Sequence, residues 1–190
     1  NRYFRAMGEA VAAAGGRGDK FIGDGIMALF GLEGAPEEGA RAALAAAGEM
    51  ARALDQLNRE LDYELEGPLR MGMGLHLGPV ILGTMGHGDS RALTAIGDTV
   101  NVASRLEALT KELGCQLVVS DRLIAAAGAE PMPGQRHEVD LRGLDRQIVV
   151  WAVPDPRALP RPKQPRGRAG PWAFLRAALV WLDRSSLGAR

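Results

Sequence analysis

The residues with the clearest chemical potential lie between Lys20 and Phe30, where a lysine and an aspartate flank a glycine turn between two apolar runs. An Asp-Gly turn between apolar runs predicts a β-hairpin, with strands over 17–22 and 26–30. The carboxylate of Asp24 then lies at a glycine-lined bend, where a hard cation such as Mg²⁺ can approach without crowding. The alternative is that Asp24 is only a turn residue and Lys20 only an exposed strand lysine.

A second pair of residues suited to chemistry is Asn101 and Arg105, in the segment Gly97-Asp-Thr-Val-Asn-Val-Ala-Ser-Arg-Leu-Glu107. The segment is predicted to be helical, and residues four apart project from the same face of a helix. A planar, permanently charged guanidinium is suited to stabilising charge that develops on a phosphate group. The alternative is that the pair forms the solvated polar face of an amphipathic helix.

These two segments resemble the signatures of the class III nucleotide cyclases, which make cyclic AMP or cyclic GMP from a nucleoside triphosphate. The resemblance implies that Asn101 orients the ribose and that Arg105 stabilises charge on the α-phosphate. It also implies that Asp24 is one of two carboxylates that hold two Mg²⁺ or Mn²⁺ ions. In the family the other metal-binding aspartate precedes the helix that opens this chain, so the resemblance places it upstream of residue 1.

The same resemblance assigns three residues to the substrate itself. Lys20 is expected beside the purine, where an ammonium donates to a ring nitrogen that is an acceptor in adenine but carries a proton in guanine. Thr94 occupies the partner position, where many adenylyl cyclases have Asp and a bacterial subgroup has Thr. Either residue accepts a hydrogen bond from the adenine amino group, although Thr also donates. Arg142 stands where the family commonly has a lysine that contacts the triphosphate.

We therefore predict an adenylate cyclase that converts ATP to 3′,5′-cyclic AMP and pyrophosphate at the interface of a homodimer. In such a dimer Asp24 of one subunit serves a site whose other residues come from the partner. Because one metal-binding aspartate is expected upstream, we expect this chain itself to be weakly active or inactive. The alternatives are a guanylate cyclase and an incompetent cyclase-like module for dimerisation or nucleotide sensing.

The elements that must position these residues alternate along the chain. Strands that alternate with helices and hairpins predict an α+β fold, and the resemblance implies the ferredoxin-like βαββαβ type with helices on a mostly antiparallel sheet. The catalytic domain lacks its first strand in this interpretation, which predicts an exposed sheet edge. Asp98 or Thr99 is expected to cap its helix. The expected helices cover 1–14, 37–60, 98–113 and a short stretch after Ser120, and the remaining strands cover 69–78, 80–82, 116–119, 137–141 and 147–153.

Composition divides the chain into three parts. Residues 1–153 are predicted to form the catalytic domain, and 154–171, which hold six of the eleven prolines, an extended linker. Residues 172–190 are expected to form a short apolar helix. The stretch 154–190 carries eight Lys and Arg against two Asp and Glu, so one hypothesis is weak contact of this helix with an anionic membrane. The alternative is a helix that docks on the domain or begins another one.

The bulk composition narrows the class of protein further. With 190 residues, 46% apolar content and zero net charge, the chain is expected to be an ordinary globular protein with no nucleic-acid partner. Its one cysteine, Cys115, is expected to be buried and cannot form an internal disulfide. The chain begins inside an expected helix, which predicts a fragment of a longer protein. We expect the cytoplasm as its compartment, with the parent protein membrane-associated through other segments if at all.

Overall fold

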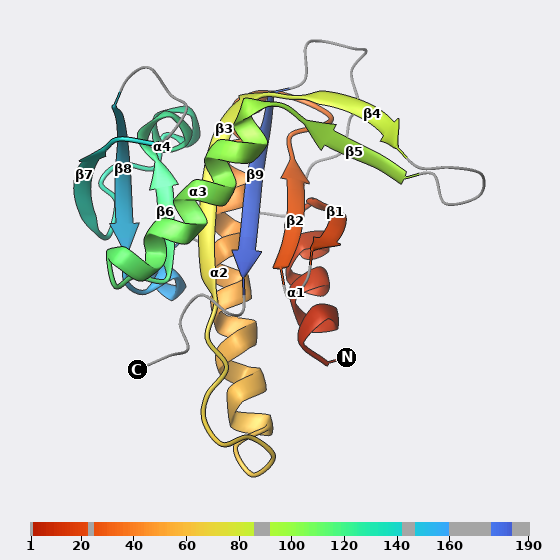
Figure 1. Ribbon diagram of the computed structural model, residues 1–190, viewed down its shortest axis with the longest axis vertical. Coiled ribbons are helices and arrows are strands. Elements are labelled where there is room, and N and C mark those ends of the chain that lie inside the picture. Colours follow the sequence, from red (N-terminus) through yellow and green to blue (C-terminus); the bar gives the residue numbers. More distant parts are fainter. Residues whose placement is uncertain (1, 23–24, 86–91, 142–146, 160–175, 184–190) are drawn as a thin grey trace.

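The computed structural model in Figure 1 describes residues 2–22, 25–85, 92–141, 147–159 and 176–183. The helices and strands are α1 (Arg2–Ala13), β1 (Arg17–Ile22), β2 (Gly25–Phe30), α2 (Pro36–Glu60), β3 (Gly72–Pro79), β4 (Ile81–Met85), β5 (Ala92–Ile96), α3 (Asp98–Glu112), β6 (Leu117–Ser120), α4 (Asp121–Ala127), β7 (Gln135–Val139), β8 (Ile148–Val153), the 3₁₀ turn η1 (Pro156–Ala158) and β9 (Arg176–Asp183).

Seven of the strands form one sheet in the order β1-β2-β9-β3-β6-β8-β7, and β4 and β5 form a separate two-stranded ribbon. Strands β3 and β6 run parallel, whereas every other neighbouring pair of the large sheet is antiparallel. Helices α1 and α2 lie on one face of this sheet and α3 on the other (Figure 1). The predicted fold class, α+β with helices on a mostly antiparallel sheet, is confirmed.

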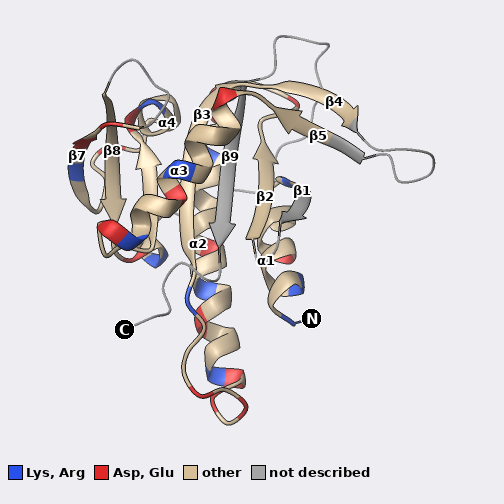
Figure 2. Ribbon diagram, in the orientation of Figure 1, with Lys and Arg blue, Asp and Glu red and all other residues tan. Residues whose placement is uncertain are grey.

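Strand β3 shows why helices can cover both faces of the sheet. Side chains alternate between the faces of a strand, and Met73, Leu75 and Leu77 all join the large apolar core that includes α1 and α2. The alternate positions Gly74 and Gly78 face α3 instead. Figure 2 shows that β3, β6 and β8 carry no charged residue, as expected for strands covered on both faces.

The central position between β2 and β3 is taken by β9, from the far end of the chain (Figure 1). On one side Phe30 pairs with Ala178 and Ile26 with Leu182, and on the other side β9 pairs with the whole of β3. The prediction of an exposed sheet edge is therefore wrong for β2 and β3 among the described residues, because both strands are hydrogen-bonded to β9.

The helix expected over 172–190 is also wrong where the structure describes this stretch, since residues Arg176–Asp183 form a strand. The sequence Ala-Ala-Leu is typical of helices, but intrinsic propensity amounts to only a few tenths of a kcal/mol for each residue. A position between two strands offers hydrogen bonds to both edges of the inserted backbone, which outweighs that preference. A membrane-surface helix over these eight residues is excluded by the same pairing.

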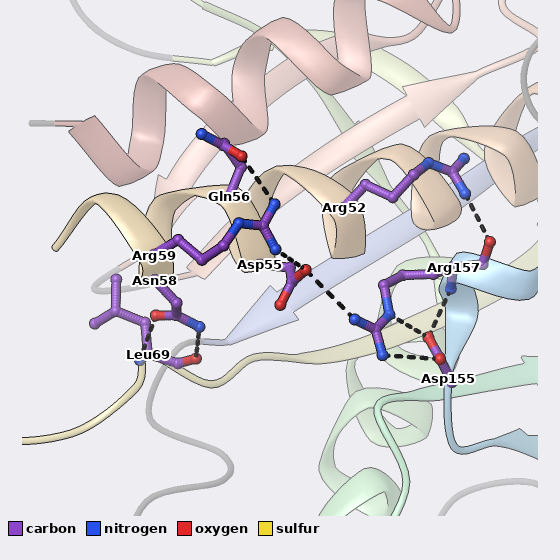
Figure 3. Close-up of polar contacts among 8 residues, drawn as sticks. All are labelled: Arg52, Asp55, Gln56, Asn58, Arg59, Leu69, Asp155 and Arg157. Atoms are coloured by element: carbon purple, nitrogen blue, oxygen red, sulfur yellow. Dashed lines mark hydrogen bonds and ion pairs between the residues drawn. The ribbon is translucent and has the colours of Figure 1, made fainter. Parts of the chain in front are cut away.

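The stretch after β8 packs on α2 before the chain leaves the described residues (Figure 3). Arg52 donates to the carbonyl oxygen of Arg157 at 2.7 Å, and Arg157 pairs with Asp155 and with Asp55. Asp155 accepts hydrogen bonds from Arg157, which lowers the pKa of its carboxyl group. Leu159 is buried against this surface. The first part of the predicted 154–171 linker is thus docked on the domain.

Local details differ from the sequence predictions at the start of α3 and at one strand. The N-cap of α3 is Gly97, with a φ of 138° that favours glycine, and Asp98 lies in the first turn instead. Ser120 is the N-cap of α4 as predicted, but its hydroxyl contacts His76 at 2.9 Å and makes no capping hydrogen bond. Strand β5 is not among the expected strands, because its sequence Ala-Leu-Thr-Ala-Ile does not alternate between apolar and polar residues.

Cys115 is buried as predicted, and burial raises the pKa of its thiol to about 11. Across the part of the chain that the structure describes, no helix combines the length and the apolar character that crossing a membrane requires.

Candidate functional site

Helix α3, which carries Asn101 and Arg105, is held unusually close to β3 by two glycines. A Cβ atom at Gly74 would lie 2.2 Å from the carbonyl oxygen of Ala103, and one at Gly78 would lie 2.4 Å from the hydroxyl of Thr99. The observed role of these glycines is to allow close packing of the helix on the strand. The backbone of α3 is therefore fixed against the centre of the sheet.

Asn101 and Arg105 lie on the side of α3 that faces away from the core. Asn101 is exposed and Arg105 half-buried, whereas Val102 and Leu106 are buried beneath them. The start of the helix is fixed separately, because the Thr99 hydroxyl donates to the carbonyl oxygen of Pro79 at 2.6 Å. An amide and a guanidinium on a rigid helix face can bind a polyanionic ligand, as the sequence predicts.

Thr94 lies in β5, four residues before the start of α3, and is only 5% exposed. Its hydroxyl donates to the Oδ2 atom of Asp19 at 2.7 Å. The backbone N–H of Ala95 points at the same oxygen at 3.5 Å. The two contacts join β5 to β1, although 75 residues separate Thr94 from Asp19.

Asp19 reaches Thr94 from an irregularity in β1. Gly18 pairs with Ala28 and Lys20 pairs with Met27, so Asp19 is an extra residue that has no partner position in β2. Such a bulge re-aims the side chains around it. Sequence reasoning missed Asp19 because a bulge depends on the register of two strands, and the only available signal was an acidic residue directly before Lys20.

The structure brings some predicted residues together and leaves others undescribed. Thr94 and the backbone of Lys20 lie on two strands joined through Asp19, and α3 with Asn101 and Arg105 follows β5 after one residue. Asp24 and Arg142 fall outside the described residues. The backbone of Lys20 lies in β1.

Other polar features of the described chain lie apart from these residues. His76 on β3 contacts Ser120, and its pKa is lowered to about 4, first by burial and then by the charge of Arg122. A hollow of about 390 Å³ at the end of α2 is lined by Asn58, Tyr63 and their neighbours and by none of the predicted site residues. Within the described ranges no three His, Cys, Asp or Glu residues are grouped to hold a metal ion.

Comparison with known families gives a match over most of the chain. The sequence model of the adenylate and guanylate cyclase catalytic domain matches residues 1–153. An adenylate cyclase from Anabaena cylindrica is 36% identical over 160 residues, which cover 80% of this chain and 31% of that protein. Adenylate cyclase 1 from Rhizobium meliloti is 32% identical over 66% of this chain and 19% of its own length. The chain thus spans less than a third of these two relatives.

Solved structures give the same result for the fold. The guanylyl cyclase Cya2 superimposes with a TM-score of 0.72 at 28% identity, over 89% of this chain and 82% of that one. A bacterial light-regulated adenylyl cyclase superimposes with a TM-score of 0.64 at 30% identity, over 82% of this chain and 44% of that one. One neighbour is thus a guanylyl cyclase and the other an adenylyl cyclase, so fold similarity does not select the base.

Proposed function

The chain belongs to the family of adenylate and guanylate cyclase catalytic domains, and from this premise we propose that it is the catalytic domain of an adenylate cyclase. The reaction would convert ATP to 3′,5′-cyclic AMP. The ribose 3′ oxygen attacks the α-phosphorus, a new O–P bond forms, the bond to the β-phosphate bridging oxygen breaks, and pyrophosphate leaves. The use of ATP favours a cytoplasmic catalytic domain in this proposal.

The observation that carries the choice of ATP is the hydrogen bond between Asp19 and Thr94. It joins β5 to the residue directly before Lys20, so this hydrogen bond connects the two strands that carry the residues expected to read the purine. In the proposal Lys20 donates to the ring nitrogen of adenine, and Thr94 accepts from the adenine amino group. Guanine presents a protonated ring nitrogen and a carbonyl oxygen at these positions, which opposes both contacts.

The residues of α3 are proposed to act on the rest of the nucleotide. Asn101 orients the ribose, and Arg105 stabilises the negative charge that develops on the α-phosphate. Arg142 is proposed to contact the triphosphate. The close packing of α3 on Gly74 and Gly78 supports these roles, because catalytic side chains are effective only when their backbone is held in place.

The proposed metal site needs carboxylate oxygens, which Mg²⁺ and Mn²⁺ prefer. Asp24 directly precedes Gly25, the first residue of β2. At this end of the sheet β9 also ends, because Leu182 pairs with Ile26 and Asp183 pairs with Gly72. The donor chemistry of the chain therefore fits a divalent cation, with Asp24 as one proposed ligand.

Asp183, the last residue of β9, is another carboxyl-bearing residue at that end of the sheet, and we propose it as a further candidate ligand. When bound, two Mg²⁺ or Mn²⁺ ions would activate the ribose 3′ hydroxyl and neutralise the triphosphate.

A homodimer is proposed as the active form, with sites shared between subunits. The β4–β5 ribbon extends away from the large sheet (Figure 1), and its paired residues Ile81 and Ile96 are 72% and 45% exposed. Exposed large apolar residues grouped on a projecting element indicate a protein interface. A partner subunit of the same chain would cover them and complete the active site.

The experiment that tests the function measures nucleotide binding and product formation by the full chain with Mg²⁺ or Mn²⁺. We expect 3′-deoxy-ATP, which cannot cyclise, to bind more tightly than 3′-deoxy-GTP. With ATP as substrate we expect weak formation of cyclic AMP. Arg105→Ala should abolish product, whereas the control Arg41→Ala, at an exposed position of α2, should not.

Each alternative function has its own outcome in this experiment. Preference for GTP would instead support a guanylate cyclase, which the similarity to Cya2 favours as a second candidate. Binding of nucleotide without any product, even at high Mn²⁺, would support the incompetent sensing module.

A further inference from the structure

The chemistry of a threonine hydroxyl makes its contact with Asp19 informative. A hydroxyl has one hydrogen to donate and two lone pairs to accept, so an isolated Thr94 would suit either a donor or an acceptor. In the structure the hydrogen is directed at Asp19, at an O···O distance of 2.7 Å. The N–H of Ala95 points at the same carboxylate oxygen, as expected for an acceptor-only group. The Thr94 hydroxyl can therefore only accept a further hydrogen bond.

A Thr94 hydroxyl that can only accept a hydrogen bond distinguishes adenine from guanine. Adenine carries an amino group at the position where guanine carries a carbonyl oxygen. An acceptor-only hydroxyl forms a hydrogen bond with the amino group but faces the carbonyl oxygen with like partial charge. Because Thr94 is 5% exposed, little water is available to reorient the hydroxyl, and the contact with Asp19 is stronger than in solvent.

We propose that Asp19 is a positioning residue for base selection, which holds the Thr94 hydroxyl as a hydrogen-bond acceptor and so favours adenine over guanine. This inference rests on the proposed function. The β-bulge at Asp19 is what allows the role, because a residue in regular register with β2 would have its side chain placed by that pairing. Since Asp19 directly precedes Lys20, one bulge serves both expected contacts with the base.

The test is a double-mutant cycle read out by equilibrium binding to the full chain. The probes are 3′-deoxy-ATP and 3′-deoxy-GTP with Mg²⁺, and the variants are Asp19→Asn, Thr94→Val and the combination of both. An amide can donate to Thr94 and free its hydrogen, so Asp19→Asn should narrow the preference for adenine by roughly 3- to 10-fold, the value of one neutral hydrogen bond. Thr94→Val should narrow it similarly, and the combined variant no further than Thr94→Val alone.

Two further variants keep the test decisive. Thr94→Ser retains the hydroxyl and should preserve the preference. Asp19→Ala leaves the hydroxyl free to rotate and should narrow it, which provides a second measurement if Asp19→Asn fails to fold.

Three results would overturn the inference. One is an equal loss of affinity for both nucleotides in Asp19→Asn, which would show a purely structural role. Another is an undiminished effect of Asp19→Asn in the Thr94→Val background, which would show that Asp19 acts elsewhere. A wild-type chain that binds neither nucleotide would overturn the proposed function together with the inference.

Discussion

At the scale of single residues, small and polar side chains determine how the site is held. Gly74 permits the contact between α3 and β3, Thr99 fixes the start of the helix on Pro79, and Asp19 joins two distant strands. None of these residues is expected to react with the substrate. They set the positions of the side chains that are, which makes them informative targets for substitution.

The first prediction at this scale concerns Gly74. Alanine there would place its Cβ atom against the backbone of Ala103 and Glu107, which cannot move as a flexible side chain does. We expect Gly74→Ala to lower the free energy of unfolding by about 1–3 kcal/mol and to weaken nucleotide binding. The matched control is Gly67→Ala, at an exposed position after α2 where a Cβ atom meets nothing within 4 Å. Urea denaturation of both variants measures the difference, and equal effects would contradict the packing argument.

The second prediction concerns His76, whose pKa in the folded chain is about 4, below the ordinary value of 6.5. Below pH 6.5 the imidazole of His76 binds a proton in the unfolded chain but not in the folded chain. The contribution of neutral His76 to the free energy of unfolding is therefore complete above pH 6.5. It is lost as the pH falls from about 6.5 to about 4, to a total of about 3 kcal/mol.

Urea unfolding at pH 7.5 and pH 4.5 tests the role of His76. His76→Gln should reduce the loss of stability at the lower pH, whereas the control His137→Gln should not. If the free energy of unfolding of His76→Gln still fell as steeply between pH 7.5 and pH 4.5, the loss would belong to other titratable groups.

At the scale of elements, the principal finding is that β9 lies between β2 and β3. Figure 1 shows that β9 ends at the end of the sheet where α1 begins. A strand preceding α1 in the chain is what the cyclase resemblance requires at that place. In this chain β9, which comes from the C-terminal part of the sequence, occupies that place between β2 and β3.

The register of β9 gives the third prediction. Leu29 and Leu179 are paired, and paired residues of antiparallel strands lie at a distance that a disulfide can span. In a Cys115→Ala background, Leu29→Cys with Leu179→Cys should form an intramolecular disulfide under mild oxidation. The control, Leu29→Cys with Leu182→Cys, is three positions out of register and should not. A disulfide-linked dimer on a non-reducing gel would show that β9 is exchanged between two chains.

At the scale of the whole molecule, the apolar surface is divided unevenly. The large sheet buries its apolar residues under α1 and α2 on one face and α3 on the other, whereas the β4–β5 ribbon leaves Ile81 and Ile96 exposed. Strands buried on both faces need no partner, but an exposed pair of isoleucines does. The ribbon is therefore where we expect a second subunit to bind.

The fourth prediction follows for assembly. Ile96→Asp should place a charge in the proposed interface and shift the chain from dimer to monomer in sedimentation or light-scattering measurements. Cyclase activity should fall with the dimer, because each site is proposed to need both subunits. Tyr63→Asp is the control, since Tyr63 is fully exposed in the loop after α2. A wild-type monomer at high concentration, or a dimer unaffected by Ile96→Asp, would contradict the proposal.

Much of the fold was predictable because the signals are local. The Asp-Gly turn predicted the β1–β2 hairpin, and the alanine-rich stretch that opens at Pro36 predicted α2. The residues of α3 were predictable for the same reason, since a spacing of four fixes a shared helix face. The bulge at Asp19, the strand β5 and the strand form of β9 were not, because each depends on how one strand pairs with another: β1 with β2, β5 with β4, and β9 with β2 and β3 far back in the sequence.

By itself, the sequence determined the family and the identity of the residues expected to contact the nucleotide, because motifs place those side chains at fixed local spacings. Only the tertiary structure decided that the Thr94 hydroxyl donates its hydrogen bond to Asp19 and that β9 lies between β2 and β3 in the sheet. The physical reason is that hydrogen-bond partners in a sheet are set by register and by competition for unpaired backbone groups. Both of these properties belong to the assembled molecule and to no single segment of it.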